Sequence, residues 1–111
     1  MPERPNILVV CGRNKRRSRT AEHLFKNDSR FAIRSAGLSP QSNRKLSEKD
    51  VLWADLILVM ENIHRARIRE EYRALALPPL EVLEIEDEYE FMAPELIQLL
   101  TERMNGILNL K

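Results

Sequence analysis

Two continuous apolar runs, residues 7–10 and 56–60, most constrain how this chain can fold. Short runs of β-branched and aliphatic residues without polar alternation are typical of strands that are buried on both faces. Each run is followed by a segment whose apolar residues recur at helical spacing. Strands that alternate with helices in this way predict a parallel sheet that is covered by helices on both of its faces.

The complete pattern predicts an α/β fold, with an open, mostly parallel, four-stranded sheet and helices on both faces, in one domain of residues 1–111. Two weaker strands are expected at residues 31–35 and 80–85. The predicted helices begin at capping or proline signals and carry amphipathic spacing; they span about residues 18–26, 47–53, 63–72 and 94–108. A loop rich in Gly, Ser, Pro and Asn is expected at residues 36–43.

Composition limits the classes of partner. The chain has 111 residues, 43% of them hydrophobic and 32% charged, which is typical of one globular domain. The formal net charge of +1 supplies no global field, so we expect neither a nucleic-acid nor a membrane partner. No apolar run approaches the roughly 20 residues that span a bilayer. A single cysteine cannot form an internal disulfide, which fits a reducing, cytoplasmic setting.

The only cysteine, Cys11, stands at the carboxyl end of the first predicted strand and directly before the first helix. Residues 11–18, the thiol loop, read Cys-Gly-Arg-Asn-Lys-Arg-Arg-Ser. Ligands of open parallel sheets bind outside this edge, and a helix N-terminus with its free amides attracts anions. Those neighbours stabilise a thiolate, Gly12 permits a tight turn, and the fork of Arg17 can hold two phosphate oxygens. These are the parts of a covalent phosphoryl-transfer site.

A non-catalytic interpretation of Cys11 and the basic run competes with the catalytic interpretation. A lone cysteine after a buried strand is more often an inert packing residue, and a basic run is more often a solvated or nucleic-acid-binding patch. The position between a buried strand and a helix favours the catalytic interpretation.

With these residues the sequence resembles the low-molecular-weight protein tyrosine phosphatases, which carry a Cys-x5-Arg-Ser/Thr loop with a central Asn after the first strand. Cys11, Asn14, Arg17 and Ser18 fall on those positions, and residues 21–25, 35–37 and 54–61 add weaker matches. The resemblance implies a phosphotyrosine phosphatase I-like, Rossmann-like three-layer fold. It also implies Cys11 as nucleophile, no metal and no cofactor. It implies a catalytic role for Arg17 as well, which would hold the phosphate oxygens as their charge shifts. The expected phosphate-binding positions are the thiol-loop residues Gly12, Arg13, Asn14, Lys15, Arg16 and Ser18.

The resemblance also implies a general acid from an Asp-Pro-Tyr segment late in the chain. The acidic segment, residues 84–90, follows the last predicted strand and should therefore reach the same sheet edge as Cys11. Asp87 falls on the acid position and Tyr89 on the aromatic position, where Tyr89 would contribute to the substrate pocket. Glu88 replaces the family's Pro, so Glu86 and Glu88 stay open as alternative acids. An exposed acidic loop that merely balances the basic loop is the competing interpretation.

Several positions depart from the family. Arg13 stands where Gly is usual, and Lys15 and Arg16 replace apolar or small residues, which predicts a cationic pocket mouth suited to acidic or multiply phosphorylated substrates. The segment between residues 37 and 45 is shorter than in larger members, which removes part of the wall that grips an aromatic ring. Trp53 is expected in the core, whereas both histidines, His23 and His64, are expected at the surface.

The sequence therefore predicts a cysteine-dependent phosphatase of phosphate monoesters, protein phosphotyrosine among them, with a phosphorylated protein or a small phosphate ester as partner. Two alternatives stay open: a non-catalytic phosphate- or RNA-binding module that uses the basic loop, and arsenate reduction with an external thiol. Steep salt dependence would mark the first alternative. The second requires an external thiol because the chain has only one cysteine.

Overall fold

The computed structural model describes residues 4–108 and confirms the predicted alternation of strands and helices. The elements are β1 (Asn6–Cys11), α1 (Arg17–Phe25), β2 (Ala32–Gly37), α2 (Glu48–Trp53), β3 (Leu56–Val59), α3 (Asn62–Glu71), β4 (Leu80–Val82) and α4 (Pro94–Leu108). Ser47 caps α2 with the predicted capping box: its side chain accepts from the Asp50 amide, and the Asp50 carboxylate accepts from the Ser47 amide.

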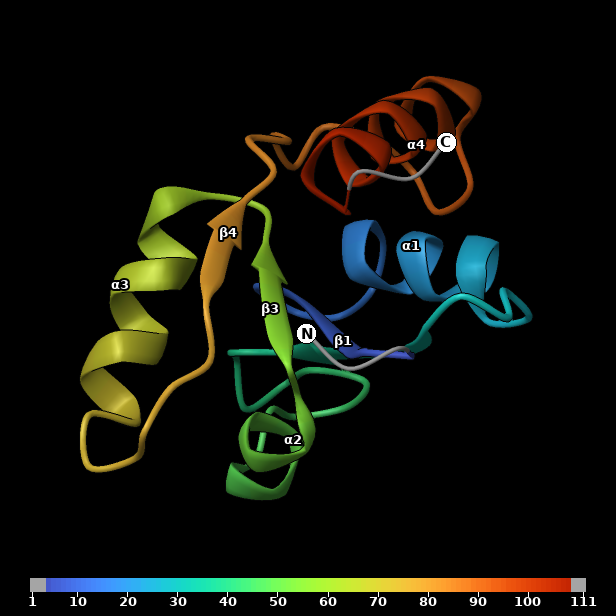
Figure 1. The fold of residues 1–111 in the computed structure, drawn as a ribbon. Helices are drawn as coiled ribbons and strands as arrows, with labels where there is room; N and C mark the ends of the chain where they lie inside the picture. Colours follow the sequence, from blue (N-terminus) through green and yellow to red (C-terminus); the bar gives the residue numbers. More distant parts are fainter. Residues whose placement is uncertain (1–3, 109–111) are drawn as a thin grey trace.

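The strands form one parallel sheet in the order β2-β1-β3-β4 (Figure 1). The chain leaves β1 toward β2 on one side and later continues from β3 to β4 on the other side. This reversal puts the topological switch point between β1 and β3, where open α/β sheets bind their ligands. Cys11, the last residue of β1, lies at that point.

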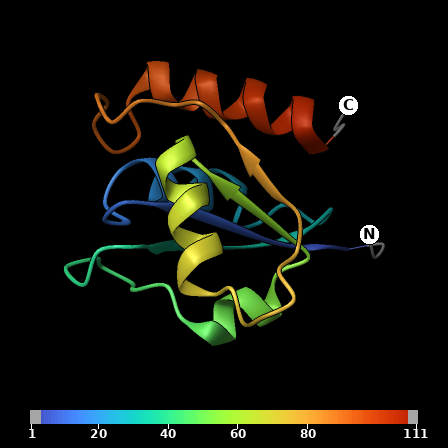
Figure 2. The same cartoon turned by 90° about the vertical axis from the view of Figure 1, so that its left-hand side faces the viewer.

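The two faces of the sheet carry separate hydrophobic clusters because successive side chains of a strand point to opposite faces. Ile7, Val9 and Cys11 join the cluster beneath α1 and α4, whereas Leu8 and Val10 join the cluster beneath α2 and α3. Figures 1 and 2 show these two helical layers, with α4 across one face and α3 on the other. The predicted three-layer architecture is thus confirmed.

The last strand is shorter than predicted, ending at Val82 instead of residue 85. Glu84 has a positive φ of 57°, which interrupts the pleat. The chain still follows β3, since the Leu83 amide donates to Val59 O (2.8 Å) and the Ile85 amide donates to Met60 O (3.0 Å). The segment after β4 is therefore led along the end of β3 to the edge where Cys11 lies.

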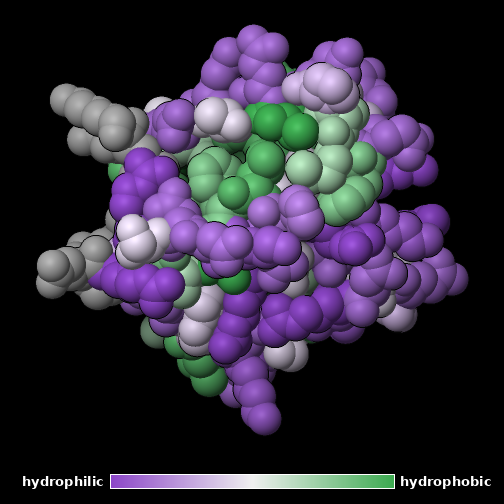
Figure 3. Space-filling model, turned by 90° about the vertical axis from the view of Figure 1, so that its right-hand side faces the viewer, coloured by the Kyte–Doolittle hydropathy of each residue, from purple (hydrophilic) through white to green (hydrophobic). Residues whose placement is uncertain are grey.

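The layer made by α1 and α4 leaves apolar atoms at the surface where the two helices meet (Figure 3). Leu24, Leu99 and Ile107 are partly buried side chains that pack against the cluster beneath these helices. Within residues 4–108, no helix combines the length and apolar character needed to cross a bilayer.

Gly37, at the end of β2, generates a stability prediction. A Cβ at this position would lie 2.1 Å from Ser42 Oγ and 2.8 Å from the backbone carbon of Arg13. Replacing Gly37 with Ala should lower the free energy of unfolding by about 1–3 kcal/mol, because the neighbouring backbone must move. Urea denaturation measures the change.

Gly106→Ala is the matched control. Within residues 4–108, no atom lies within 4 Å of a Cβ built at Gly106, which sits in α4. This substitution should raise stability by about 0.5–1 kcal/mol, as Ala does in a helix interior. An unchanged stability in Gly37→Ala would contradict the close approach at the end of β2.

Candidate active site

The thiol loop borders a pocket of about 400 Å³, within the size range of small-molecule sites. Cys11 itself is 3% exposed, and α1 begins at Arg17, so the helix N-terminus with its free amides adjoins the loop. The residues that line the pocket are Cys11, Arg13, Lys15, Arg16, Arg17 and Asp87.

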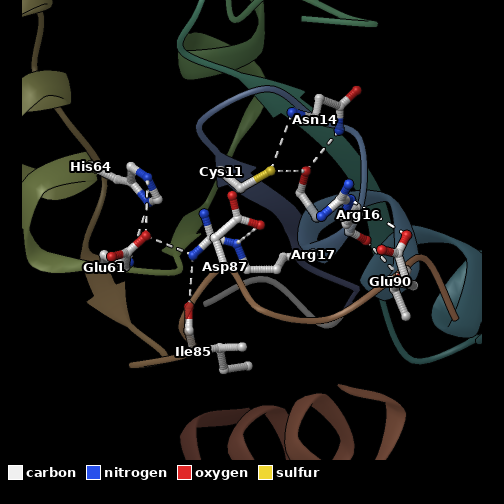
Figure 4. Close-up of polar contacts among 11 residues, drawn as sticks. Cys11, Asn14, Arg16, Arg17, Glu61, His64, Ile85, Asp87 and Glu90 are labelled. Atoms are coloured by element: carbon white, nitrogen blue, oxygen red, sulfur yellow. Dashed lines mark hydrogen bonds and ion pairs between the residues drawn. The ribbon is translucent and has the colours of Figure 1, made fainter. Parts of the chain in front are cut away.

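Two hydrogen-bond donors converge on the sulfur of Cys11 (Figure 4). The backbone amide of Asn14 donates to Cys11 Sγ at 3.2 Å, and Ser18 Oγ lies 3.0 Å from the same atom. Asn14 Nδ2 donates to Ser18 Oγ at 2.7 Å, which leaves the Ser18 hydroxyl hydrogen available for the sulfur. A thiolate accepts from both donors, as a nucleophile in this position requires.

Asn14 turns the loop around the sulfur. Its φ of 53° lies in the left-handed region, which Asn tolerates better than other residues with a side chain. The residue is 2% exposed, and its backbone and side chain both serve the Cys11–Ser18 contact. The central Asn of the thiol loop is therefore a structural requirement of this turn.

The segment after β2, residues 38–43, binds the outer side of the thiol loop and is called here the backing segment. Carbonyl oxygens of four consecutive loop residues accept hydrogen bonds from it: Cys11 O from Leu38 N (3.1 Å), Gly12 O from Ser39 N (2.7 Å), Arg13 O from Asn43 N (3.2 Å) and Asn14 O from Asn43 Nδ2 (3.0 Å). With the carbonyl groups turned toward the backing segment, loop amides are free to face an anion. The sequence predicts only a loop for this segment, and no local motif marks its role.

Arg17 is 4% exposed and is held by two acceptors. Its Nη1 donates to Glu61 Oε2 and to the backbone oxygen of Ile85, both at 2.7 Å (Figure 4). Its Nε is buried and donates to no acceptor among the described residues, while Asp87 Oδ1 lies 3.7 Å away. A buried cationic donor without a partner is costly, and an anion oxygen in the pocket would satisfy it.

Glu61 and His64 also belong to the site, although the sequence predicts no role there for either residue. Glu61 follows β3 and caps α3, and the hydrogen bond from Arg17 lowers the pKa of its carboxyl group. The Glu61 amide donates to His64 Nδ1 at 3.2 Å, so Nε2 carries the proton of the neutral ring and lies 3.8 Å from Glu61 Oε2. A charged residue directly after a strand of the switch point is the signal that could have identified Glu61.

The prediction that His64 lies at the surface is wrong, whereas His23 is exposed as predicted. His64 is 6% exposed because the first turn of α3 packs it toward the thiol loop, with Nε2 about 4.0 Å from where a Cβ on Gly12 would lie. Burial lowers the pKa of His64, and the nearby cationic Arg17 lowers it further. The ring is therefore kept neutral beside Arg17.

The acidic segment reaches the sheet edge, but its carboxylates separate. Asp87 lines the pocket with a side chain that is 62% exposed. Glu86 lies along a different cavity, beside α3, and Glu88 is exposed. Glu90 faces Arg16 at 3.7 Å. Among these acids, Asp87 has the position that a proton donor to a pocket ligand needs.

The aromatic residues lie away from the pocket. Tyr89 packs, partly buried, against the cluster beneath α1 and α4 and does not join Asp87 in the pocket lining. Trp53 packs against the opposite cluster, as expected for a core residue, and the Arg34 guanidinium lies 4.1 Å from its ring centroid. Within residues 4–108, no aromatic residue lines the pocket, and a substrate contact of Tyr89 stays a prediction.

The described residues also include no group of three or more His, Cys, Asp or Glu side chains placed to hold a metal ion. The groups that the pocket does bring together are a sulfur with two donors, an incompletely paired guanidinium and a carboxylate. Such a set can bind a phosphate, attack it and exchange a proton with it.

Solved structures of phosphatases, a low-molecular-weight protein tyrosine phosphatase among them, match the fold of this chain almost throughout. The tyrosine phosphatase Wzb from Escherichia coli K30, in complex with phosphate, has a TM-score of 0.73 and 22% identity, covering 96% of this chain and 99% of that chain. The low-molecular-weight phosphatase SP-PTP from Streptococcus pyogenes has a TM-score of 0.74 and 17% identity, covering 95% and 91%.

The YwlE arginine phosphatase from Geobacillus stearothermophilus matches with a TM-score of 0.69 and 22% identity, covering 95% of this chain and 93% of that chain. No protein-family model matches the chain, and no curated protein matches it in sequence. The fold is thus that of the low-molecular-weight phosphatases, while the chemistry and substrate depend on this chain's own residues.

The burial of His64 predicts a pH-dependent stability. An unfolded histidine titrates near pH 6.5, whereas the folded protein resists protonation of His64, so the unfolded state binds more protons just below that pH. The free energy of unfolding should therefore fall as the pH is lowered from about 7 toward 5.5. His64→Gln should flatten this slope, measured by urea denaturation at several pH values.

His23→Gln is the control, because His23 is exposed on α1. It should retain the slope of the wild type. A slope that persists in His64→Gln would show that His64 is not the group that resists protonation.

Proposed function

We propose that this protein is a cysteine-dependent phosphatase that hydrolyses phosphate monoesters, including protein phosphotyrosine, through a phosphocysteine intermediate. The observation that carries the proposal is one pocket in which the Cys11 sulfur accepts from the Asn14 amide and lies 3.0 Å from Ser18 Oγ, Arg17 Nε has no hydrogen-bond acceptor among the described residues, and Asp87 lines the wall. The phosphatase folds that match the chain support the same assignment.

In the first step the Cys11 thiolate attacks the phosphorus of the bound ester. The sulfur–phosphorus bond forms as the bond from phosphorus to the leaving oxygen breaks, and Asp87 gives that oxygen a proton. Arg17 Nε and the amides of the thiol loop hold the non-bridging oxygens while their charge redistributes.

In the second step the Asp87 carboxylate takes a proton from a water molecule, whose oxygen attacks the phosphorus. The sulfur–phosphorus bond breaks, inorganic phosphate leaves, and Cys11 returns as a thiolate. Asp87 is then protonated again, so the cycle needs no further reactant. Because oxidation of Cys11 would remove the nucleophile, the cycle suits a reducing compartment such as the cytoplasm.

The alternatives from the sequence are less well supported. A phosphate- or RNA-binding module gives no reason for two donors on a buried sulfur, and base stacking requires aromatic side chains that the described lining lacks. Arsenate reduction would need an external thiol, since Cys11 is the only cysteine of the chain.

Cys11→Ser tests the nucleophile. Turnover of p-nitrophenyl phosphate should fall to background, because the serine hydroxyl is a poor nucleophile without a general base. Inorganic phosphate binding, measured by calorimetry, should persist and report an intact pocket. Turnover at the wild-type rate would exclude the phosphocysteine mechanism.

Asp87→Asn tests the general acid against its neighbours. Turnover of an alkyl phosphate should fall by about 10²–10⁴-fold, as expected for loss of a positioned acid. Turnover of p-nitrophenyl phosphate should fall less, since its leaving group needs less protonation. Glu86→Gln and Glu88→Gln are matched controls on either side, and a larger loss in either of them would move the acid role there.

A further inference from the structure

The structure sorts the five cationic side chains at and beside the thiol loop by what they contact. Arg17 is held by Glu61 and, in the proposed mechanism, binds the phosphate through its Nε. Arg16 faces Glu90 at 3.7 Å, which compensates part of its charge. The Arg19 guanidinium lies 4.9 Å from the ring centroid of Phe91, along a second cavity on the outer side of α1.

Two cations are left over, Arg13 and Lys15. Both are exposed, both line the pocket beside Cys11, and neither makes an ion pair within the described part of the chain. The backbone of Arg13 is fixed, because its carbonyl accepts from the Asn43 amide of the backing segment. The backbone from which the Arg13 side chain extends is thus fixed at the pocket mouth, and both charges are available to a ligand.

Apart from charged groups, the described lining of the pocket offers a substrate few side chains to contact. Since the described lining has no aromatic residue, a flat uncharged leaving group finds no ring to stack on. A phosphorylated arginine would bring a cationic guanidinium against Arg13 and Lys15, and like charges at an interface are unfavourable. An anionic group beside the phosphate would instead meet two unpaired cations.

We propose that Arg13 and Lys15 form a second anion subsite, and that the preferred substrates are phosphorylated protein segments with acidic residues next to the phosphorylated side chain. Consecutive residues of an extended peptide are about 3.3–3.6 Å apart. Carboxylates one or two residues away therefore fall within reach of side chains at the pocket mouth. This inference rests on the proposed phosphatase function and specifies its substrate class.

Two phosphotyrosine peptides test the subsite, one flanked by Glu on both sides and the other by Gln. The wild type should prefer the Glu peptide by roughly three- to tenfold in kcat/KM at low salt, the range of two exposed ion pairs. The preference should shrink near 1 M salt, where the screening length is only about 3 Å. Arg13→Gln combined with Lys15→Gln should bring the ratio close to one.

Lys49→Gln combined with Arg69→Gln is the matched control. It removes the same charge from exposed positions of α2 and α3 outside the pocket lining, so the ratio should stay at the wild-type value. An equal loss of preference in this control would mean that only net charge matters, which would overturn the subsite.

Further outcomes separate the inference from the proposed function. Equal hydrolysis of both peptides, or faster hydrolysis of a phosphoarginine peptide, would overturn the subsite while leaving phosphatase activity in place. Faster turnover of fructose 1,6-bisphosphate than of the Glu peptide would overturn the protein substrate. If the wild type hydrolyses neither peptide nor p-nitrophenyl phosphate, the proposed function fails and this inference fails with it.

Discussion

The buried guanidinium of Arg17 joins three parts of the chain that are far apart in sequence. It starts α1, donates to Glu61 at the beginning of α3, and donates to the Ile85 backbone after β4. A buried cation is strongly destabilising unless it is paired. The contacts of Arg17 therefore fix the start of α1, the start of α3 and the segment after β4 relative to one another. Among the described residues, Arg17 Nε has no hydrogen-bond acceptor, and an anion in the pocket would supply one.

Around this guanidinium, the parallel sheet brings the remaining groups to one edge. Cys11 ends β1 beside the switch point, Glu61 follows β3, and Asp87 follows the kinked chain after β4. The backing segment holds the carbonyl groups of the thiol loop, and it can approach so closely because Gly37 has no Cβ. The pocket is therefore built by backbone packing as much as by the side chains that line it.

The charges at this edge have different tasks because their partners differ. Glu61 holds Arg17, and the neutral His64 beside it adds no second positive charge to this partly buried pair. Glu90 faces Arg16, whereas Arg13 and Lys15 remain at the pocket mouth with no ion pair in the described residues. A basic run that is uniform in sequence thus separates into a buried cation held by acceptors (Arg17), a cation that faces Glu90 (Arg16) and two exposed cations with no ion pair in the described residues (Arg13 and Lys15).

The sequence by itself determined the sheet, its helices and the place of Cys11, because buried apolar runs, capping signals and a strand–loop–helix motif are local patterns. It also determined that the acidic segment would reach the same edge, since parallel strands end together. Only the tertiary structure decided which acid lines the pocket, that Tyr89 and Trp53 each pack against a hydrophobic cluster, and that His64 is buried beside Glu61. Those outcomes depend on packing between segments distant in the chain, such as the Arg17 contacts and the positive φ of Glu84, which no local pattern encodes.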